Sequence, residues 1–211
     1  MSQTVEQQRK YGSAPMWILM ILFALPAMAA WFYYLNPEML PQGRSNNGQL
    51  IVPVISVTEI SLATAQGTSL DLSSLRPNWT LLILGSGNCD AACRGRTAEA
   101  RQIQKALAEN GSRLERLLVL QGEQVMPSVL ALNGSVPGTH ITLASDQLLQ
   151  VLSATQEHGV ESVNNVFIID PRGNLMMQYH PDTSAKEILE DLERLMKASK
   201  SWVKGAQYGH R

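Results

Sequence analysis

The stretch WTLLILGSGNCDAACR, residues 79–94, decides the fold. Residues 79–84 form an almost unbroken apolar run of strand length, which is typical of a strand buried on both faces within an α/β sheet. The residues that follow break this strand, and Ser86 or Asn88 can cap a helix with small or apolar residues at helical spacing up to Asn110-Gly111. The stretch therefore predicts a buried strand, a turn and a helix, with two cysteines in the first helical turn.

The rest of the chain adds strands and helices on both sides of this unit. Strands are predicted at 50–60 and 68–75, which form a small hairpin, and at 114–120, 166–169 and 175–179, the last two joined by a turn at 170–173. A helix is predicted at about 145–154, and Ser184 with Glu187 forms a capping box that opens an amphipathic final helix. This order predicts a single α/β sandwich with helices on both sheet faces.

Residues 16–35, MWILMILFALPAMAAWFYYL, carry no charge. At about 1.5 Å per residue, a helix of this length spans a hydrocarbon core of roughly 30 Å. Arg9 and Lys10 precede the segment and predict a cytoplasmic N-terminus. A cleaved signal peptide is the alternative, because Ala27-Met28-Ala29 supplies a cleavage site. The apolar run continues beyond that site, which favours a membrane anchor.

Five regions follow from this reading. They are a cytoplasmic N-terminal tail at 1–15, a transmembrane helix at 16–35, a linker rich in Pro, Gly and Asn at 36–48, an exported domain at 49–198 and a C-terminal tail at 199–211. The 17 Lys and Arg against 18 Asp and Glu leave a net charge of −1, which argues against nucleic acid as a partner. Nucleotide-binding and hydrolase signatures are missing from the sequence.

Cys89 and Cys93 are the only cysteines in the chain. Residues four apart share one helical face, so the two sulfurs can form a disulfide or bind a soft metal ion. A helix N-terminus also favours a thiolate. Three interpretations remain open: a structural disulfide, a redox dithiol and a copper(I) site. A bridge that closes so short a loop contributes roughly 2 kcal/mol or less, so stability is a weak reason for it.

The stretch LLILGSGNCDAACRGR at 81–96, with VFIIDPRGNLMMQY at 166–179 and the amphipathic final helix, resembles the Sco/SenC branch of the thioredoxin-like superfamily. Members of that branch are membrane-anchored copper-delivery and thiol-redox proteins that assist cytochrome c oxidase assembly in the respiratory chain. The resemblance covers about residues 70–197 and carries over Cys89 and Cys93. It implies a thioredoxin-like three-layer sandwich, preceded by one N-terminal transmembrane helix. The chain also looks like small membrane proteins found among bacterial oxidase assembly components, which implies the inner membrane and a periplasmic domain.

The sequence departs from this family at the third copper ligand. Copper-binding members have a His a few residues before the apolar strand of the late hairpin, and that position falls at about Ser162. His158 lies four residues upstream and is the nearest candidate, followed by His180 and His140. For each of them a solvated loop imidazole is the favoured alternative. The missing ligand favours thiol redox chemistry over copper delivery.

The function implied by the resemblance is cytochrome c oxidase assembly by thiol–disulfide exchange or transient copper(I) handling. In the redox version Cys89 is the attacking thiolate and Cys93 the resolving thiol. The partners expected are oxidase subunits or assembly factors and the lipid bilayer. The alternative is a non-catalytic accessory or scaffolding subunit of a haem-copper oxidase, with an inert disulfide. The sequence leaves open whether the chain is an enzyme and how many copies associate.

Overall fold

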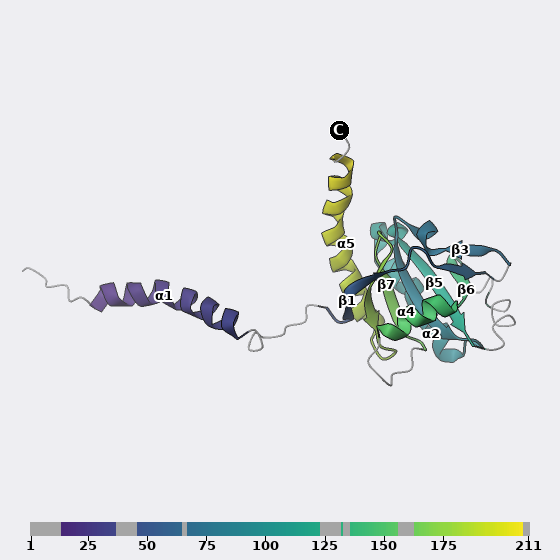
Figure 1. Ribbon diagram of the computed structural model, residues 1–211, viewed down its shortest axis with the longest axis horizontal. Helices are drawn as coiled ribbons and strands as arrows, with labels where there is room; N and C mark the ends of the chain where they lie inside the picture. The colour runs from purple at the N-terminus through teal and green to yellow at the C-terminus, as the bar shows by residue number, and fades with distance from the viewer. Residues whose placement is uncertain are drawn as a thin grey trace, which may run out of the picture. The chain divides into compact units, whose positions relative to one another are not determined.

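The computed structural model describes residues 14–36, 46–64, 67–122, 132, 136–155 and 163–208. It separates into two compact units, Met1–Arg44 and Ser45–Arg211. In the first unit, α1 (Ala14–Leu35) is one helix that continues through Pro26, and nearly all of its side chains are exposed (Figure 1). Within the described ranges, α1 is the one helix long and apolar enough to cross a membrane. The structure thus contains the single helix that the sequence predicts at 16–35.

The second unit is built on one mixed sheet with the strand order β1-β8-β7-β4-β5-β6 (Figure 1). The strands are β1 (Gln49–Ser56), β4 (Trp79–Ser86), β5 (Leu114–Gln121), β6 (Thr139–Leu143), β7 (Val166–Ile169) and β8 (Asn174–Tyr179). β4 and β6 each run parallel to β5, and the other neighbours are antiparallel. Seven of the eight residues of β4 are buried, because its two faces contact two separate cores. The predicted central strand is confirmed.

Helices cover both faces of this sheet. One core joins the sheet to α2 (Ala91–Ala106) and α5 (Ala185–Tyr208), which supply apolar side chains such as Ile103 and Leu192. The opposite core joins it to α4 (Asp146–Ala154), through Leu148 and Leu152, and to a second, small sheet of β2 (Ser61–Ala63) and β3 (Ser69–Asp71). Two 3-10 turns, η2 (Leu72–Leu75) and η3 (Ala108–Arg113), also lie in the described part of the unit. The predicted three-layer α/β sandwich is confirmed.

Three local features differ from the sequence predictions. The strand expected at 50–60 does not form the hairpin; β1 joins the main sheet beside β8, and the hairpin consists of β2 and β3. Neither Ser86 nor Asn88 caps α2, because Asp90 is the N-cap residue and Ser86 ends β4. α5 continues to Tyr208, so a helix runs through residue 199, where the C-terminal tail was expected to begin.

Asp191, on α5, binds the start of the second unit through hydrogen bonds. Its buried Oδ2 accepts hydrogen bonds from the backbone N–H groups of Asn47, at 2.8 Å, and Gly48, at 2.9 Å. The Tyr179 hydroxyl donates to the same oxygen at 3.1 Å. Burial, followed by the charge of Asp191 and this hydrogen bond, raises the pKa of Tyr179. Most of the predicted linker, residues 37–45, lies outside the described residues.

Candidate functional site

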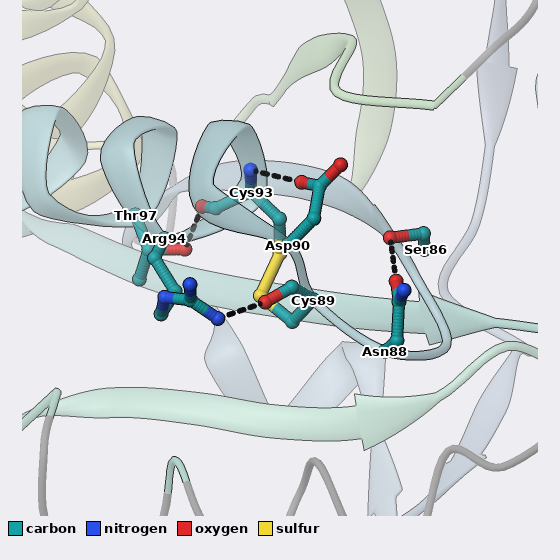
Figure 2. The surroundings of a disulfide bond; sticks show 7 residues. All are labelled: Ser86, Asn88, Cys89, Asp90, Cys93, Arg94 and Thr97. Carbon is teal, nitrogen blue, oxygen red and sulfur yellow. Dashed lines mark hydrogen bonds between the residues drawn. A yellow bond between two sulfur atoms is a disulfide. The ribbon is translucent and has the colours of Figure 1, made fainter.

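Cys89 and Cys93 form a disulfide at the start of α2, directly after the central strand (Figure 2). The two Cα atoms are 5.1 Å apart, within the usual range for a disulfide. Cys89 is 1% exposed and Cys93 is fully buried, so both side chains belong to the core beneath α2 and α5. The sequence left open whether the two cysteines form a bridge, a dithiol or a metal site. In this structure they form a buried bridge.

Local hydrogen bonds hold the backbone around the bridge (Figure 2). The Asp90 carboxylate accepts from the Cys93 N–H at 3.0 Å, which caps α2. The Arg94 guanidinium donates to the Cys89 carbonyl at 2.7 Å, and the Thr97 hydroxyl donates to the Cys93 carbonyl at 2.9 Å. Each cysteine therefore has its carbonyl oxygen bound by a side chain of α2.

The backbone of Cys89 lies in the left-handed region, with φ of +36°. Few residues other than glycine adopt this region, and the cost is of the order of 1–3 kcal/mol. Such strain persists where the surrounding structure enforces it, and it is found most often at functional sites. At Cys89 the turn from β4 into α2 and the bond from the Cys89 N–H to the Ser86 carbonyl, at 2.9 Å, hold this conformation.

Gly85 makes room for the bridge on the sheet. A Cβ on this residue would lie 2.8 Å from Cys93 Sγ and 2.8 Å from Leu120 Cδ2, much closer than atoms pack. The disulfide thus lies directly against the backbone of β4, with a leucine of β5 beside it. The close approach of the sulfur requires glycine at this position. From the sequence, Gly85 was interpreted only as part of the segment that breaks the strand.

The segment before β7 runs beside the same end of β4. The Asn164 N–H donates to the Leu84 carbonyl at 2.6 Å, and the Leu84 N–H donates to the Asn165 carbonyl at 3.1 Å. Asn165 is 4% exposed, and its side-chain oxygen has no hydrogen-bond partner. The chain that follows residues 156–162 thus enters the sheet next to the strand that leads to the cysteines.

The histidine predictions divide into three outcomes. His158 lies outside the described residues. His140 is on β6, where its ring lies 3.3 Å from Glu115, and His180 follows β8 and pairs with Asp182 at 2.7 Å. Both partners are carboxylates, and in the described part of the chain no group of three or more His, Cys, Asp or Glu side chains could hold a metal ion. Of the predicted ligands that lie within the described residues, the structure therefore brings together Cys89 and Cys93 alone.

The donor set nevertheless suits copper(I) once the bridge is reduced. Two thiolates are soft ligands, and two of them satisfy copper(I) in linear geometry. Copper(II) prefers three or four ligands including imidazole, and the described residues supply no third donor to the pair. Reduction is a precondition for either ion, because the sulfurs of a disulfide are bonded to each other.

Arg94 and Thr97 are site residues that sequence reasoning did not assign. Thr97 follows from the helix itself, since it lies four positions beyond Cys93 on the same helical face. Arg94 instead reaches back from α2 to a carbonyl that precedes the helix. Neither residue belongs to a sequence motif that would mark it. The hydroxyl of a Thr within an α-helix commonly donates to the carbonyl four residues before, as Thr97 does here.

Comparisons with known proteins identify the fold. A family model described as "Transmembrane-like, thioredoxin-like, C-terminal domain" matches residues 79–199. The apo Sco1 protein from Thermus thermophilus is similar in structure, with a TM-score of 0.54 and 17% identity over 71% of this chain and 96% of that one. So is a thiol:disulfide interchange protein of the thioredoxin family from Chlorobium tepidum TLS, with a TM-score of 0.54 and 17% identity over 68% of this chain and 97% of that one.

A copper-bound ScoI from Arabidopsis thaliana is similar with a TM-score of 0.51 and 13% identity, over 66% of this chain and 96% of that one. A search of curated proteins found no significant match. At these identities the structures establish the fold alone, and the predicted thioredoxin-like sandwich is confirmed.

Proposed function

Because this chain belongs to the family of transmembrane-like, thioredoxin-like C-terminal domains, we propose that it is a membrane-anchored factor that assists cytochrome c oxidase assembly through Cys89 and Cys93. α1 anchors it in a bacterial inner membrane, with the N-terminus in the cytoplasm and the domain in the periplasm. The observation that carries the proposal is the Cys89–Cys93 bridge at the end of the central strand. It joins Cys89, which lies just before the Asp90 N-cap and not in the first helical turn as predicted, to Cys93 in the first turn of α2.

The chemistry is exchange of two electrons with a partner disulfide. In the reduced protein the Cys89 thiolate attacks one sulfur of the partner disulfide, which forms a mixed disulfide and releases one partner thiolate. Cys93 then attacks Cys89 Sγ, which closes the bridge and releases the second partner thiolate. The two protons lost by the cysteines pass through solvent to the partner, which is reduced as the protein is oxidised. The partner is an oxidase subunit or another assembly factor.

Copper(I) handling is the second use of the same pair in this proposal. Cys89 and Cys93 bind the ion as thiolates, and His158 is the proposed third ligand. Support for His158 comes from the chain that follows it, since Asn164 and Asn165 pair with Leu84 at the cysteine end of β4. The ion is cargo. Exchange with a partner disulfide, which takes up the two electrons, would close the bridge and release the ion, because a bridged sulfur no longer binds copper(I).

Trapping the mixed disulfide tests the exchange. A Cys93→Ser variant of the full chain keeps the attacking thiol and lacks the resolving one, so it is expected to accumulate a covalent adduct with its partner in the membrane. Cys89→Ser is the matched control, since it removes one sulfur from the same pair and is expected to trap none. Non-reducing gels of membranes, followed by mass spectrometry of the adduct, identify the partner. Oxidase assembly that persists with Cys89→Ser contradicts the proposal.

The burial of both sulfurs favours a second candidate function. A bridge with side chains 1% and 0% exposed is shielded from other thiols, as expected for an inert disulfide in an accessory or scaffolding subunit of a haem-copper oxidase. Purification of the oxidase separates the two functions. A permanent, stoichiometric association that survives in a Cys89→Ser/Cys93→Ser variant indicates the subunit, and a transient association lost in that variant indicates the assembly factor.

A further inference from the structure

A cavity of about 220 Å³ between α2 and β5 is lined by three cationic side chains. Arg101 and Lys105 lie four residues apart on α2, and Arg116 comes from β5. Thr97 and Gln102 add polar groups to the wall. The volume is well above the roughly 10–15 Å³ that one water molecule needs, so the cavity has room for a group of several atoms.

Arg116 is the unusual member of this cavity, because it is 4% exposed and largely unpaired. Its Nη2 donates to the Pro137 carbonyl at 2.8 Å. Nε and Nη1 are buried without a hydrogen-bond partner. A buried ionised group with free donors is destabilising unless a partner satisfies it. The guanidinium thus has N–H groups available to a ligand.

The charge of Arg116 is not balanced within the cavity. None of the described residues that line it is acidic. Glu115 is the neighbour of Arg116 in sequence, but successive side chains of a strand point to opposite faces of the sheet. The Glu115 carboxylate lies outside the cavity and pairs with Asn78 at 2.9 Å and His140 at 3.3 Å. Burial, and then the like charge of Arg101, lower the pKa of Arg116, and the charge of Glu115 offsets only part of this effect. Two arginines that repel each other across a cavity indicate a missing anion.

We propose that this cavity binds a small oxyanion, a phosphate or carboxylate group, between Arg116 and the pair Arg101 and Lys105. The buried guanidinium donates to the oxygens of the anion from the sheet side, and the two side chains of α2 neutralise its charge from the helix side. Arg101, Gln102 and Lys105 are exposed, so they form the open wall through which the anion enters. This site is independent of the cysteine chemistry.

The test is a titration of the oxidised full chain in an uncharged maltoside detergent, at fixed ionic strength. Inorganic phosphate and acetate are titrated separately and followed by calorimetry and by the melting temperature, which a ligand of the folded state raises. We expect one saturable site per chain for at least one anion, and the tighter of the two identifies the group. An Arg101→Gln/Lys105→Gln variant, changed only at exposed positions, is expected to bind at least tenfold more weakly.

Lys186→Gln is the matched control, because Lys186 is an exposed cation on α5 outside the cavity. Its binding is expected to stay within twofold of the unmodified chain. Arg116→Met removes the buried donors. We expect that adding the anion no longer raises the melting temperature of this variant. The proposal is overturned if neither anion saturates, if the Arg101→Gln/Lys105→Gln variant binds as the unmodified chain does, or if Lys186→Gln weakens binding equally.

Discussion

Gly85 and Cys93 are in direct contact: a methyl group on the glycine would lie 2.8 Å from the sulfur. The contact joins the central strand to the first turn of α2, and it leaves the disulfide no freedom to move toward the sheet. A substitution at either residue therefore alters the packing of the other.

We expect Gly85→Ala to lower the free energy of unfolding of the oxidised chain by about 1–3 kcal/mol, the usual effect of overpacking a core. The added methyl group meets both Cys93 Sγ and Leu120 Cδ2, which have to shift. Denaturant unfolding of the purified full chain measures the change. Gly95→Ala is the control, since a Cβ there meets no atom within 4 Å and alanine favours a helix by about 0.5–1 kcal/mol. Equal stability of Gly85→Ala and the unmodified chain would contradict this contact.

Reduction of the bridge is expected to be slow and to depend on the cap of α2. Both sulfurs are buried, so a reducing thiol reaches them only when the first helical turn opens. Asp90→Ala removes the side chain that holds the Cys93 N–H, which costs about 1 kcal/mol, and is expected to speed reduction several-fold. The rate with dithiothreitol measures this.

The matched variant for Asp90→Ala is Ser145→Ala. Ser145 caps α4 through the Leu148 N–H at 3.3 Å, so its removal costs similar stability at a helix remote from the bridge. We expect its reduction rate to equal that of the unmodified chain. A faster rate in both variants would mean that global unfolding, rather than opening of α2, exposes the sulfurs.

The buried Tyr179 phenol is expected to make the free energy of unfolding depend on pH in the alkaline range. Burial and Asp191 raise its pKa, so the folded chain keeps the phenol neutral where the unfolded chain ionises it, above pH of about 10. Its contribution is complete below that pH and is lost as pH rises, with a slope of up to about 1.4 kcal/mol per pH unit. Tyr179→Phe is expected to remove this part of the slope. Urea unfolding between pH 8 and 11 compares the two chains, and identical slopes would contradict the prediction.

Copper(I) binding is expected only in the reduced chain. Anaerobic titration against a competing chromophoric chelator should show one ion per chain, lost in Cys89→Ser/Cys93→Ser. His158→Ala is expected to weaken binding, because His158 is the proposed third ligand. His180→Ala serves as its control because His180 pairs with Asp182. No competitive binding by the reduced chain would remove the copper role and leave thiol exchange.

The sequence predicted the elements that are long and apolar. The runs at 79–84, 114–120 and 166–169 became β4, β5 and β7, since an apolar strand has few places to lie other than the sheet centre. The capping box also held, because the Ser184 N–H donates to Glu187 at 2.9 Å and the Glu187 N–H donates to the Ser184 hydroxyl at 3.3 Å. The hydrogen bonds from Ser184 lower the pKa of Glu187, as the box requires.

What the sequence did not predict depends on contacts between distant residues. β6, with the sequence THITL, is a short edge strand in which polar and apolar residues alternate, so it lacks an apolar run. Asp90 competes with Ser86 and Asn88 as a cap, and only the end of β4 decides between them. The cationic cavity joins residues of α2 and β5 whose pairing no local pattern reveals.

The hydrogen bonds to Asp191 also have a mechanical consequence. A domain held by a membrane helix receives any pull through the chain that precedes residue 47. The backbone of Asn47 and Gly48 is fixed to α5 before β1 begins, so tension passes into a long helix packed on the core. Without that attachment the same force would act on β1, an edge strand that can be peeled from β8 one hydrogen bond at a time.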